Sequence, residues 1–406
     1  MRLLSNLLRS FVRNGRMTLI DASGTTHVFG GTAPGPSVAI RLHDPALATK
    51  LFFNPELHAG EAYMNGTLTF EPGSDVGDLM AVFAANRVAL GAHASQRLLR
   101  SAWRGLKRWH QRNRVPEAAS NARHHYDVST DLYRLFLDGG LNYSCAVFAD
   151  PEHDTLEQAQ FRKLERITAK LALSPGMRVA EIGSGWGSLA IHIARSTGAS
   201  VTAINVSPEQ IGVARQRVAD AGVADLVEFR ELDYRNLEGQ FDRVVSVGMM
   251  EHVGVGNFDT YFGKIKSLLT PDGFAMIHSI GRMAPPGSTG PFIRKYIFPG
   301  AYVPSLSEVF ASTERSGLWV ADMEVLRLHY YHTLRHWRQR FAVNRAQAAA
   351  LYDERFCRMW EYYLAAVEVG FLNGSNMVFQ LLLSGKRDAV PIIRDYMVEA
   401  GRQGPR

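Results

Sequence analysis

The period of the apolar positions changes along the chain, and this change predicts how the fold is organised. From about residue 123 onward, short apolar runs of strand length alternate with stretches of helical period. Such alternation indicates a parallel β-sheet that is covered by helices on both faces, an α/β fold. The predicted strands are 177–182, 200–205, 227–232, 242–247, 274–280, 318–326 and 376–384.

Residues 1–95 have a different pattern, which predicts a smaller α+β domain. Two strand-like runs flank the turn residues Asp21–Gly24, an arrangement typical of a β-hairpin. A third strand-like run and two stretches of helical period follow. The expected strands are 17–20, 26–29 and 38–42, and the expected helices are 45–59 and 75–90.

The net charge of +6 is unevenly distributed. Residues 1–122 contain 14 Lys and Arg against 8 Asp and Glu, whereas residues 123–406 contain 31 of each sign. The densest run, 97–114, has seven cations, no acid, and apolar residues at helical spacing. Such a segment favours binding to an anionic membrane surface, with residues 2–16 as a second candidate, or a solvated helix that packs on a neighbouring domain. Nucleic-acid binding is disfavoured, because no nucleic-acid-binding module is recognisable.

Composition excludes several classes of protein. With 46% hydrophobic and 21% charged residues, the chain is globular and neither disordered nor fibrous. Its two cysteines, Cys145 and Cys357, exclude a disulfide framework and a cysteine-rich zinc site. No apolar run reaches the roughly 20 residues that span a bilayer. Because Arg9 and Arg13 interrupt the leucine-rich N-terminus, no signal peptide is expected, and a cytoplasmic protein is favoured.

A glycine-rich turn follows the first strand of the larger domain. The strand carries Glu181 near its end and leads into Gly183-Ser184-Gly185-Trp186-Gly187, after which a helix begins at Ser188. Glycines at such a turn let main-chain N–H groups approach a ligand at a helix N-terminus. The third glycine comes one position too early for a dinucleotide fingerprint. An acid before the loop suits a cationic or hydroxylated ligand better than a pyrophosphate.

This arrangement resembles motif I of the S-adenosylmethionine (SAM)-dependent methyltransferases. Asn205 stands where many members of that family carry an acid for the ribose hydroxyls. Asp233, which is followed by Tyr234, matches the family's acid that faces the adenine amino group. The resemblance therefore implies that SAM is the cofactor.

Further motifs narrow the resemblance to one group of methyltransferases. In order and spacing they resemble the cyclopropane-fatty-acyl-phospholipid synthases and the related mycolic acid cyclopropane synthases. The segment Gly60–Gly66 extends the resemblance into the N-terminal domain. The motifs are His124–Asp131, Asn142–Ala146, Val245–Gly254, Phe274–Gly281, Lys295–Gly300 and His329–Leu334.

The resemblance implies a fold and a division into domains. The fold is the class I SAM-methyltransferase one, with a Rossmann-like seven-stranded sheet whose last strand is antiparallel. A smaller N-terminal α+β domain precedes it. The expected division is a lipid-engaging domain at 1–95, a basic amphipathic connector at 96–122 and a catalytic domain at 123–395.

The resemblance also implies an activity and its residues. In this family the SAM methyl is transferred to the cis double bond of an acyl chain in a phospholipid, and a bicarbonate ion serves as the base that lets a cyclopropane ring close. The matching bicarbonate ligands are Cys145, Glu251, His278, Tyr330 and the main chain at Ile280. The matching SAM-binding residues are Tyr143, Ser144, Glu181, Gly183, Gly185, Gly187, Asn205, Gln210, Asp233 and Tyr234, and no metal is expected.

Three alternatives stay open at this point. A related lipid methyltransferase would add a methylene or methyl branch in place of a ring. A methyltransferase of small molecules or RNA would act on a water-soluble acceptor. A non-catalytic lipid-binding protein would bind SAM without turnover. The family resemblance further suggests an enzyme that works peripherally at the inner membrane surface, and a possible homodimer.

Overall fold

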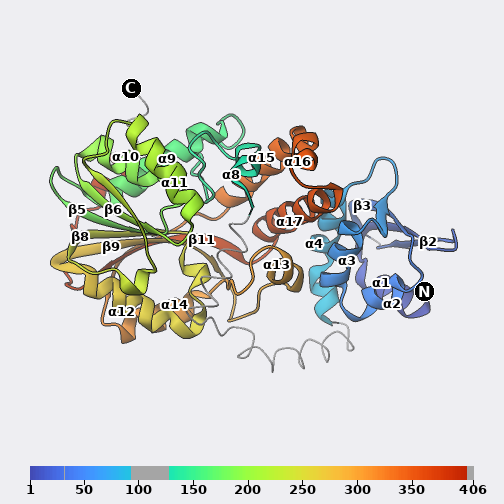
Figure 1. Ribbon diagram of the computed structural model, residues 1–406. Coiled ribbons are helices and arrows are strands. Elements are labelled where there is room, and N and C mark those ends of the chain that lie inside the picture. The colour runs from blue at the N-terminus through green and yellow to red at the C-terminus, as the bar shows by residue number, and fades with distance from the viewer. Residues whose placement is uncertain (32, 93–127, 400–406) are drawn as a thin grey trace. The chain divides into compact units, whose positions relative to one another are not determined.

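A seven-stranded β-sheet forms the centre of the second of two units into which the chain divides. The computed structural model describes residues 1–31, 33–92 and 128–399 (Figure 1). The basic run 97–114 and the first four residues of the motif His124–Asp131 lie outside the described residues. What the sequence suggests about them stays a prediction.

All seven strands predicted for the larger domain are present. Their bounds are β5 Arg178–Ile182, β6 Ser200–Asn205, β7 Val227–Glu231, β8 Phe241–Val247, β9 Leu269–Arg282, β10 Trp319–Val325 and β11 Asn376–Ser384. The strand order is β10-β11-β9-β8-β5-β6-β7. Strands β5 to β9 pair in parallel, and β11 is antiparallel to both of its neighbours. The predicted fold class and the antiparallel last strand are thus confirmed.

Helices cover both faces of this sheet (Figure 1). They are α9 Leu156–Lys170, α10 Ser188–Thr197, α11 Pro208–Asp220, α12 Phe258–Leu268, α14 Leu306–Arg315 and α18 Asp395–Glu399. Ile167 of α9, Ile193 of α10 and Ile211 of α11 belong to the core on one face. Phe262 of α12 and Val309 of α14 belong to the core on the other. Short segments near the site are α8 Thr130–Arg134 and the 3-10 turns η1 Tyr234–Asn236, η2 Met250–His252 and η3 Val255–Asn257.

The first unit contains a four-stranded sheet. Its strands are β1 Asn14–Ile20, β2 Thr26–Gly30, β3 Ala33–Leu42 and β4 Leu68–Phe70, in the order β2-β1-β3-β4. Strands β1 and β2 are antiparallel, which confirms the predicted hairpin, whereas β1 and β3 are parallel. The three-residue strand β4 was not predicted, because so short a run has no readable period.

The helices of the N-terminal part correct one expectation. They are α1 Arg2–Phe11, α2 Leu47–Phe53, α3 Pro55–Met64 and α4 Val76–Ala92. The single helix expected at 45–59 is divided between α2 and α3 at Asn54. Pro55 cannot continue α2, since it has no N–H to donate, but it suits the first position of α3. The Asn54 side chain accepts a hydrogen bond from Leu57 N at 3.3 Å and so caps α3.

Helix α1 packs its apolar face inward. Leu4, Leu7, Leu8 and Phe11 are buried in the core of the first unit. Three of the four leucines of this helix are therefore used by the fold itself, while Leu3 is 56% exposed. In the described parts of the chain, no helix is both long and apolar enough to cross a bilayer.

The units do not follow the expected division of the sequence. Ser288–Pro299 and Trp337–Ser375, both inside the expected catalytic domain, pack with the N-terminal residues in the first unit. They leave the sheet after β9 and after β10 and return to it, so a reading of consecutive strands does not reveal them. Their helices are α13 Pro291–Tyr296, the later part of α15 His329–Val343, α16 Arg345–Leu351 and α17 Glu354–Leu372.

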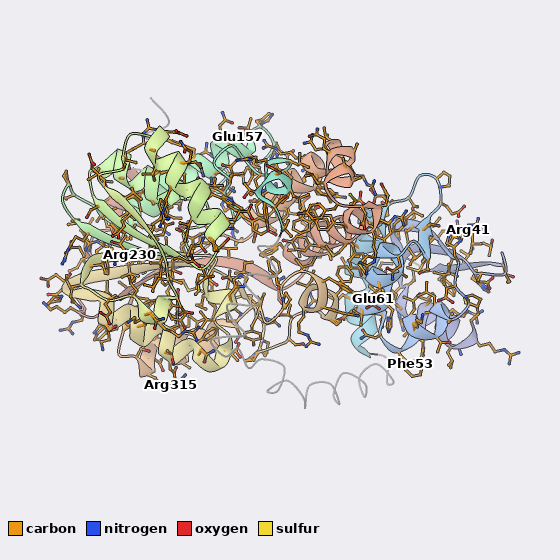
Figure 2. All side chains as sticks on the ribbon, in the orientation of Figure 1. Arg41, Phe53, Glu61, Glu157, Arg230 and Arg315 are labelled. Atoms are coloured by element: carbon orange, nitrogen blue, oxygen red, sulfur yellow. The ribbon has the colours of Figure 1, made fainter. Side chains whose placement is uncertain are left out.

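The segment Gly60–Gly66, at the end of α3, is where Ser288–Pro299 and Trp337–Ser375 contact this helix. The carboxylate of Glu61, labelled in Figure 2, accepts hydrogen bonds from Lys295 Nζ at 2.6 Å and from Tyr296 Oη at 2.9 Å. Tyr63 Oη donates to Glu361 at 2.8 Å. This motif therefore has a structural role in the first unit.

Candidate active site

The glycine loop turns between β5 and α10 at the carboxyl end of the parallel strands. Gly183, Gly185 and Gly187 have φ angles of 86°, 52° and 83°. These lie in the left-handed region, which glycine enters without steric cost. A Cβ on Gly187 would also lie 2.8 Å from Cζ of Phe229. The three glycines are therefore required by the loop's conformation, as a close-approach turn predicts.

Glu181 is buried directly before this loop. Glu181 is 3% exposed, and its Oε2 has no hydrogen-bond partner among the described residues. Burial raises the pKa of Glu181 to about 8, against the opposing influence of the Lys163 ammonium. An unsatisfied buried carboxyl oxygen is costly, so it marks a position where a ligand's donor group would be stabilised.

Asn205 connects the glycine loop to the start of α11. Its Nδ2 donates to Gly185 O at 3.2 Å and to Gln210 Oε1 at 2.8 Å. Its Oδ1 accepts from the N–H groups of Val206 and Ser207. An asparagine amide has two N–H donors and two acceptor lone pairs, so the protein itself uses all four. Asn205 therefore positions the loop, and Gln210, whose Nε2 takes no part in this bond, is the better candidate for a ligand contact.

Asp233 and Tyr234 follow β7 at the same edge of the sheet. Arg235 holds the Asp233 carboxylate through Nε at 2.8 Å and Nη2 at 2.6 Å. Burial would raise the pKa of Asp233, but the Arg235 hydrogen bonds outweigh it and keep the pKa below its usual value. The Tyr234 ring is 5% exposed and packs against Tyr261 in the core. Its side chain thus serves the core.

Glu251 and the end of β9 form the centre of the predicted anion site. Glu251 lies in η2, after β8, and its Oε1 accepts a hydrogen bond from the Ile280 N–H at 2.6 Å. The Ile280 amide therefore positions Glu251 instead of standing free for an anion. Burial raises the pKa of Glu251 to about 7, and no hydrogen bond from the described residues reaches its Oε2.

His278 lies two residues before Ile280 on β9 and is 3% exposed. Its Nδ1 is 3.1 Å from Nε2 of Gln380 on the neighbouring strand β11. Burial lowers the pKa of His278 to about 3, and the ammonium groups of Lys163 and Lys170 add to this effect. The imidazole is therefore neutral at physiological pH.

Cys145 and Tyr330 come from segments that are joined to each other. Cys145 is 1% exposed, and burial raises the pKa of its thiol well above the usual value, so the thiol stays protonated. The next residue, Ala146, donates its N–H to Thr333 Oγ1 at 3.0 Å. Thr333 stands one turn after Tyr330 on α15, and Tyr330 is 7% exposed.

Lys163 on α9 is the common neighbour of the two predicted sites. Its Nζ donates to Asn142 Oδ1 at 2.8 Å and to Ser144 Oγ at 3.2 Å. Its charge also acts on Cys145, Glu181 and His278. Burial lowers the pKa of Lys163 to about 8. The structure thus brings Cys145, Ser144, Glu181 and His278 around one buried cation.

Tyr143 lies beside this group, where its ring packs edge-on against Tyr133 with centroids 5.1 Å apart. Tyr133 in turn packs against Trp186 of the glycine loop, at 4.9 Å. The predicted SAM-binding segment at 143–144 is therefore held next to the glycine loop by aromatic contacts.

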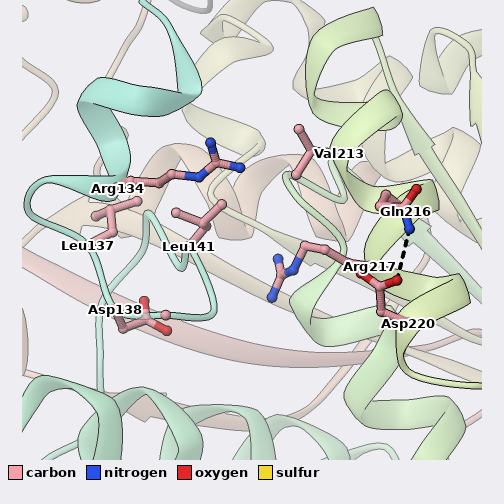
Figure 3. Close-up of a pocket in the computed structure, with 9 residues that line it drawn as sticks. Arg134, Leu137, Asp138, Leu141, Val213, Gln216, Arg217 and Asp220 are labelled. Atoms are coloured by element: carbon pink, nitrogen blue, oxygen red, sulfur yellow. Dashed lines mark hydrogen bonds between the residues drawn. The ribbon is translucent and has the colours of Figure 1, made fainter.

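A cavity of about 380 Å³ lies between the end of α8 with the segment that follows it and the later turns of α11 (Figure 3). Arg217, on its wall, donates to Gly140 O at 2.9 Å and to Trp186 O at 2.7 Å. This arginine thereby ties the glycine loop to the segment before Tyr143. The lining contains none of the predicted site residues; it consists of Arg134, Leu137, Asp138, Gly139, Leu141, Val213, Gln216, Arg217 and Asp220.

Sequence reasoning missed Lys163, Thr333 and Gln380. A signal existed for Lys163, because it shares a face of α9 with the buried Ala159 and Ile167, where a lysine is unusual. Gln380 interrupts the apolar strand β11. Thr333 gave no signal of its own. None of these positions could be paired with a partner before the strands were in register.

Comparisons with known proteins agree with this arrangement. Residues 113–381 match the family described as mycolic acid cyclopropane synthetase. A probable fatty acid methyltransferase of Pseudomonas putida is 38% identical over 86% of this chain and 87% of its own. The cyclopropane-fatty-acyl-phospholipid synthase of Escherichia coli is 35% identical over 87% of this chain and 89% of its own. A mycolic acid cyclopropane synthase, solved in complex with SAH and CTAB, superposes with a TM-score of 0.62 and 30% identity over 65% of this chain and 97% of that one.

Proposed function

From the premise that the chain belongs to the mycolic acid cyclopropane synthetase family, and is a SAM-dependent methyltransferase, we propose that it acts on unsaturated phospholipids. The proposed reaction transfers the SAM methyl group to the cis double bond of an acyl chain and closes a cyclopropane ring. Similarity to the Escherichia coli cyclopropane-fatty-acyl-phospholipid synthase over most of both chains supports this choice of substrate.

The residues at the end of β5 and in the turns that follow β5 and β6 fit SAM. The unsatisfied Oε2 of Glu181 offers an acceptor, the glycine loop allows close approach at the N-terminus of α10, and Gln210 offers an amide donor. When bound, SAM supplies an electrophilic methyl group on a sulfonium. Glu181 and the loop would hold it, and Tyr143 with Ser144 would close the site beside it.

An isolated alkene makes particular demands on the protein. It is a poor nucleophile and has no proton to lose before it attacks. The site must therefore exclude water and hold the double bond against the methyl donor. When the alkene electrons form the new carbon–carbon bond, a carbon of the acyl chain becomes cationic. A base must then remove a proton from the new methyl group so that the electrons of that C–H bond close the ring.

The group around Glu251 fits a small anion, which we propose is the bicarbonate ion of the family's mechanism. His278 is neutral and can donate a hydrogen bond, and Lys163 contributes a buried positive charge nearby. The Cys145 thiol stays protonated and donates to Ala146 O at 3.3 Å. Glu251 Oε2 has no partner among the described residues and would accept a proton from the bound ion. Neutral donors and a fixed cation in a low-dielectric site stabilise an anion beside a developing cation.

The observation that carries the proposal is the pairing of two buried carboxyl oxygens without partners, one at the glycine loop and one beside β9. A suitable test incubates the purified full-length protein with labelled SAM, bicarbonate, and vesicles of a phospholipid with one cis double bond per chain. We expect label in the lipid, a ring in the product, and a slower reaction when bicarbonate is removed. Glu251→Gln should lower turnover about 100-fold or more while SAM binding changes little.

Several outcomes would contradict the proposal. Methylation of a water-soluble acceptor without any of the vesicles would indicate a small-molecule or RNA methyltransferase. SAM binding without turnover on the lipid would indicate a binding protein. Equal loss of SAM binding and turnover in Glu251→Gln would show that Glu251 is not in the anion site.

A second product class is favoured by one observation, the 38% identity to a probable fatty acid methyltransferase. In that reaction the cation loses a different proton, and a methylene- or methyl-branched acyl chain results. An acyl chain with a cyclopropane ring and one with a methylene branch have equal mass, but mild hydrogenation adds hydrogen only to the methylene branch. Mass spectrometry of the product before and after this treatment therefore separates the two.

A further inference from the structure

A row of polar side chains crosses three strands of the sheet and ends at His278. Glu324 on β10 is paired in register with Gln380 on β11, and Gln380 is paired with His278 on β9. Residues that are directly paired across strands carry their side chains on the same face. Helix α9 packs on this face and adds Lys170 to the row.

The hydrogen bonds of the row have a defined direction. Lys170 Nζ donates to Glu324 Oε2 and to Gln380 Oε1, at 2.6 Å in each case. Gln380 Nε2 lies 3.1 Å from His278 Nδ1. An ammonium group paired with a carboxylate has donors and no acceptor, so it requires the amide oxygen of Gln380 to face it. The amide NH2 then faces His278.

This direction determines where His278 carries its proton. An amide nitrogen donates, so Nδ1 of His278 must accept. A neutral imidazole has one N–H group, which is then on Nε2. Lys170 is 3% exposed, Gln380 1% and His278 3%, so solvent does not compete for these bonds. The burial that lowers the pKa of His278, together with the charges of Lys163 and Lys170 on α9, keeps the ring from taking a second proton.

We propose that Gln380 and Lys170 are positioning residues that hold His278 in the Nε2–H tautomer, so that His278 donates a hydrogen bond to the anion and does not act as the base. The proposal rests on the proposed function, because the anion is part of that reaction. It assigns the removal of the methyl proton to Glu251 and the ion beside it. Glu324, which Arg166 also contacts through Nε at 2.9 Å, anchors the far end of the row.

The tautomer can be observed directly. The full-length protein is labelled with nitrogen-15 histidine, and correlations between the ring carbon-bound protons and the ring nitrogens are recorded by NMR. His278→Gln identifies the signals of His278 among the 14 histidines. We expect a protonated Nε2 and an unprotonated Nδ1 in the wild type. A proton on Nδ1 would overturn the proposal.

Two variants connect the tautomer to catalysis. Gln380→Glu keeps the size of the side chain but replaces the NH2 donor with an acceptor, so His278 should carry its proton on Nδ1. Lys170→Met removes the donor that orients the amide, so both tautomers should appear. We expect kcat for lipid methylation to fall about 10- to 100-fold in both variants, with the KM for SAM little changed. Gln240→Glu, at an exposed glutamine that donates to Ser267 O at 2.8 Å, is the matched control.

The readouts separate the possible failures. A loss of kcat without a change of tautomer would make the row a structural network and overturn the proposal, as would a change of tautomer without a loss of kcat. The NMR signals do not depend on turnover. A wild-type protein with Nε2–H on His278 and no activity on lipid would therefore defeat the proposed function, while the tautomer assignment would stand.

Discussion

At the scale of single residues, the site is built from groups that oppose folding. Glu181, Glu251 and Lys163 are buried ionisable side chains. Burial raises the pKa of the two carboxyl groups and lowers the pKa of the lysine, so it favours the neutral form of each. A buried group with a shifted pKa makes folding stability depend on pH. The same burial gives these groups the low-dielectric surroundings in which they can stabilise charge during a reaction.

Glu251→Gln should separate the stability effect from the catalytic one. The pKa of Glu251 rises from 4.5 in the unfolded chain to about 7 in the fold. Above pH 4.5 the unfolded chain loses a proton that the fold retains, so wild-type stability falls as pH rises until about pH 7. Glutamine cannot ionise, and its Oε1 still accepts from Ile280. Between pH 5 and pH 8, the stability of the variant relative to wild type should therefore rise by about 2–3 kcal/mol.

Urea unfolding of both proteins without ligand, at pH 5 and pH 8, measures this difference. A cost from the new NH2 group is the same at both pH values and cancels. Glu238→Gln, at an exposed carboxylate, controls for the loss of a surface charge. A relative stability that does not change with pH would show that Glu251 is ionised in the fold as readily as in water.

These residues differ in how far a linear pattern predicts them. Glu181, Glu251 and His278 lie near or after the ends of the predicted strands, inside recognisable motifs, so their place at one edge of the sheet could be predicted. Asn205 was expected at the ribose, but the structure uses its whole hydrogen-bonding capacity to position the loop. Gln380 acquires its role from a lysine 210 positions away, a pairing that a linear pattern does not contain.

At the scale of elements, helix α3 is the clearest case of a motif with a packing role. Gly60 lies where Phe292 of α13 and Tyr362 of α17 approach the helix backbone. Most strands of the larger domain were predicted to within about two residues, because each is a short apolar run with turns at both ends, whereas β9 extends beyond the predicted 274–280 to Leu269–Arg282. The attachment of α13 and α17 to α3 was not, since the helical period reveals a buried face and does not reveal its partner.

Substituting glycines in two helices tests this packing. A Cβ on Gly60 would lie 2.4 Å from Cδ2 of Phe292 and 2.8 Å from Cε1 of Tyr362. Gly60→Ala should therefore destabilise the protein by about 1–3 kcal/mol, the usual cost of overpacking. Gly212→Ala on α11 is the matched control, because its Cβ would meet no atom within 4 Å. That change should stabilise the protein by up to about 1 kcal/mol.

Thermal unfolding of the two variants, each compared with wild type, provides the measurement. Opposite signs are expected. A neutral Gly60→Ala would mean that α13 and α17 do not contact α3 as closely as the structure shows.

At the scale of the whole molecule, the distribution of charge suggests how the protein reaches a substrate in a bilayer. The described helices provide no membrane span, and α1 buries Leu4, Leu7 and Leu8 in the core of the first unit. The excess of +6 lies in residues 1–122, and its densest part is the run 97–114. We propose that this run adsorbs to anionic lipid headgroups through its charge and its tryptophans.

Neutralising four cations of the run tests this proposal. At about 1 kcal/mol per basic residue near an anionic surface, their loss should weaken vesicle binding on the order of 10²- to 10³-fold at low salt. Sedimentation with vesicles rich in anionic phospholipid measures the affinity. The residues to replace with glutamine are Arg100, Arg104, Lys107 and Arg108, and a matched set of exposed cations in the second unit is Arg178, Arg195, Lys386 and Arg387.

The comparison distinguishes a local surface from the effect of total charge. Both sets lower the net charge equally, so a role for the specific run requires a large loss in the first variant and a small one in the second. Raising the salt concentration should reduce the difference. At 0.1 M salt, the attraction between exposed charges is largely screened beyond about 10 Å, and higher salt shortens this distance. Unchanged binding in the first variant would remove the membrane role of the run. Equal losses in both would assign adsorption to overall charge, since long-range attraction then dominates over any local contact.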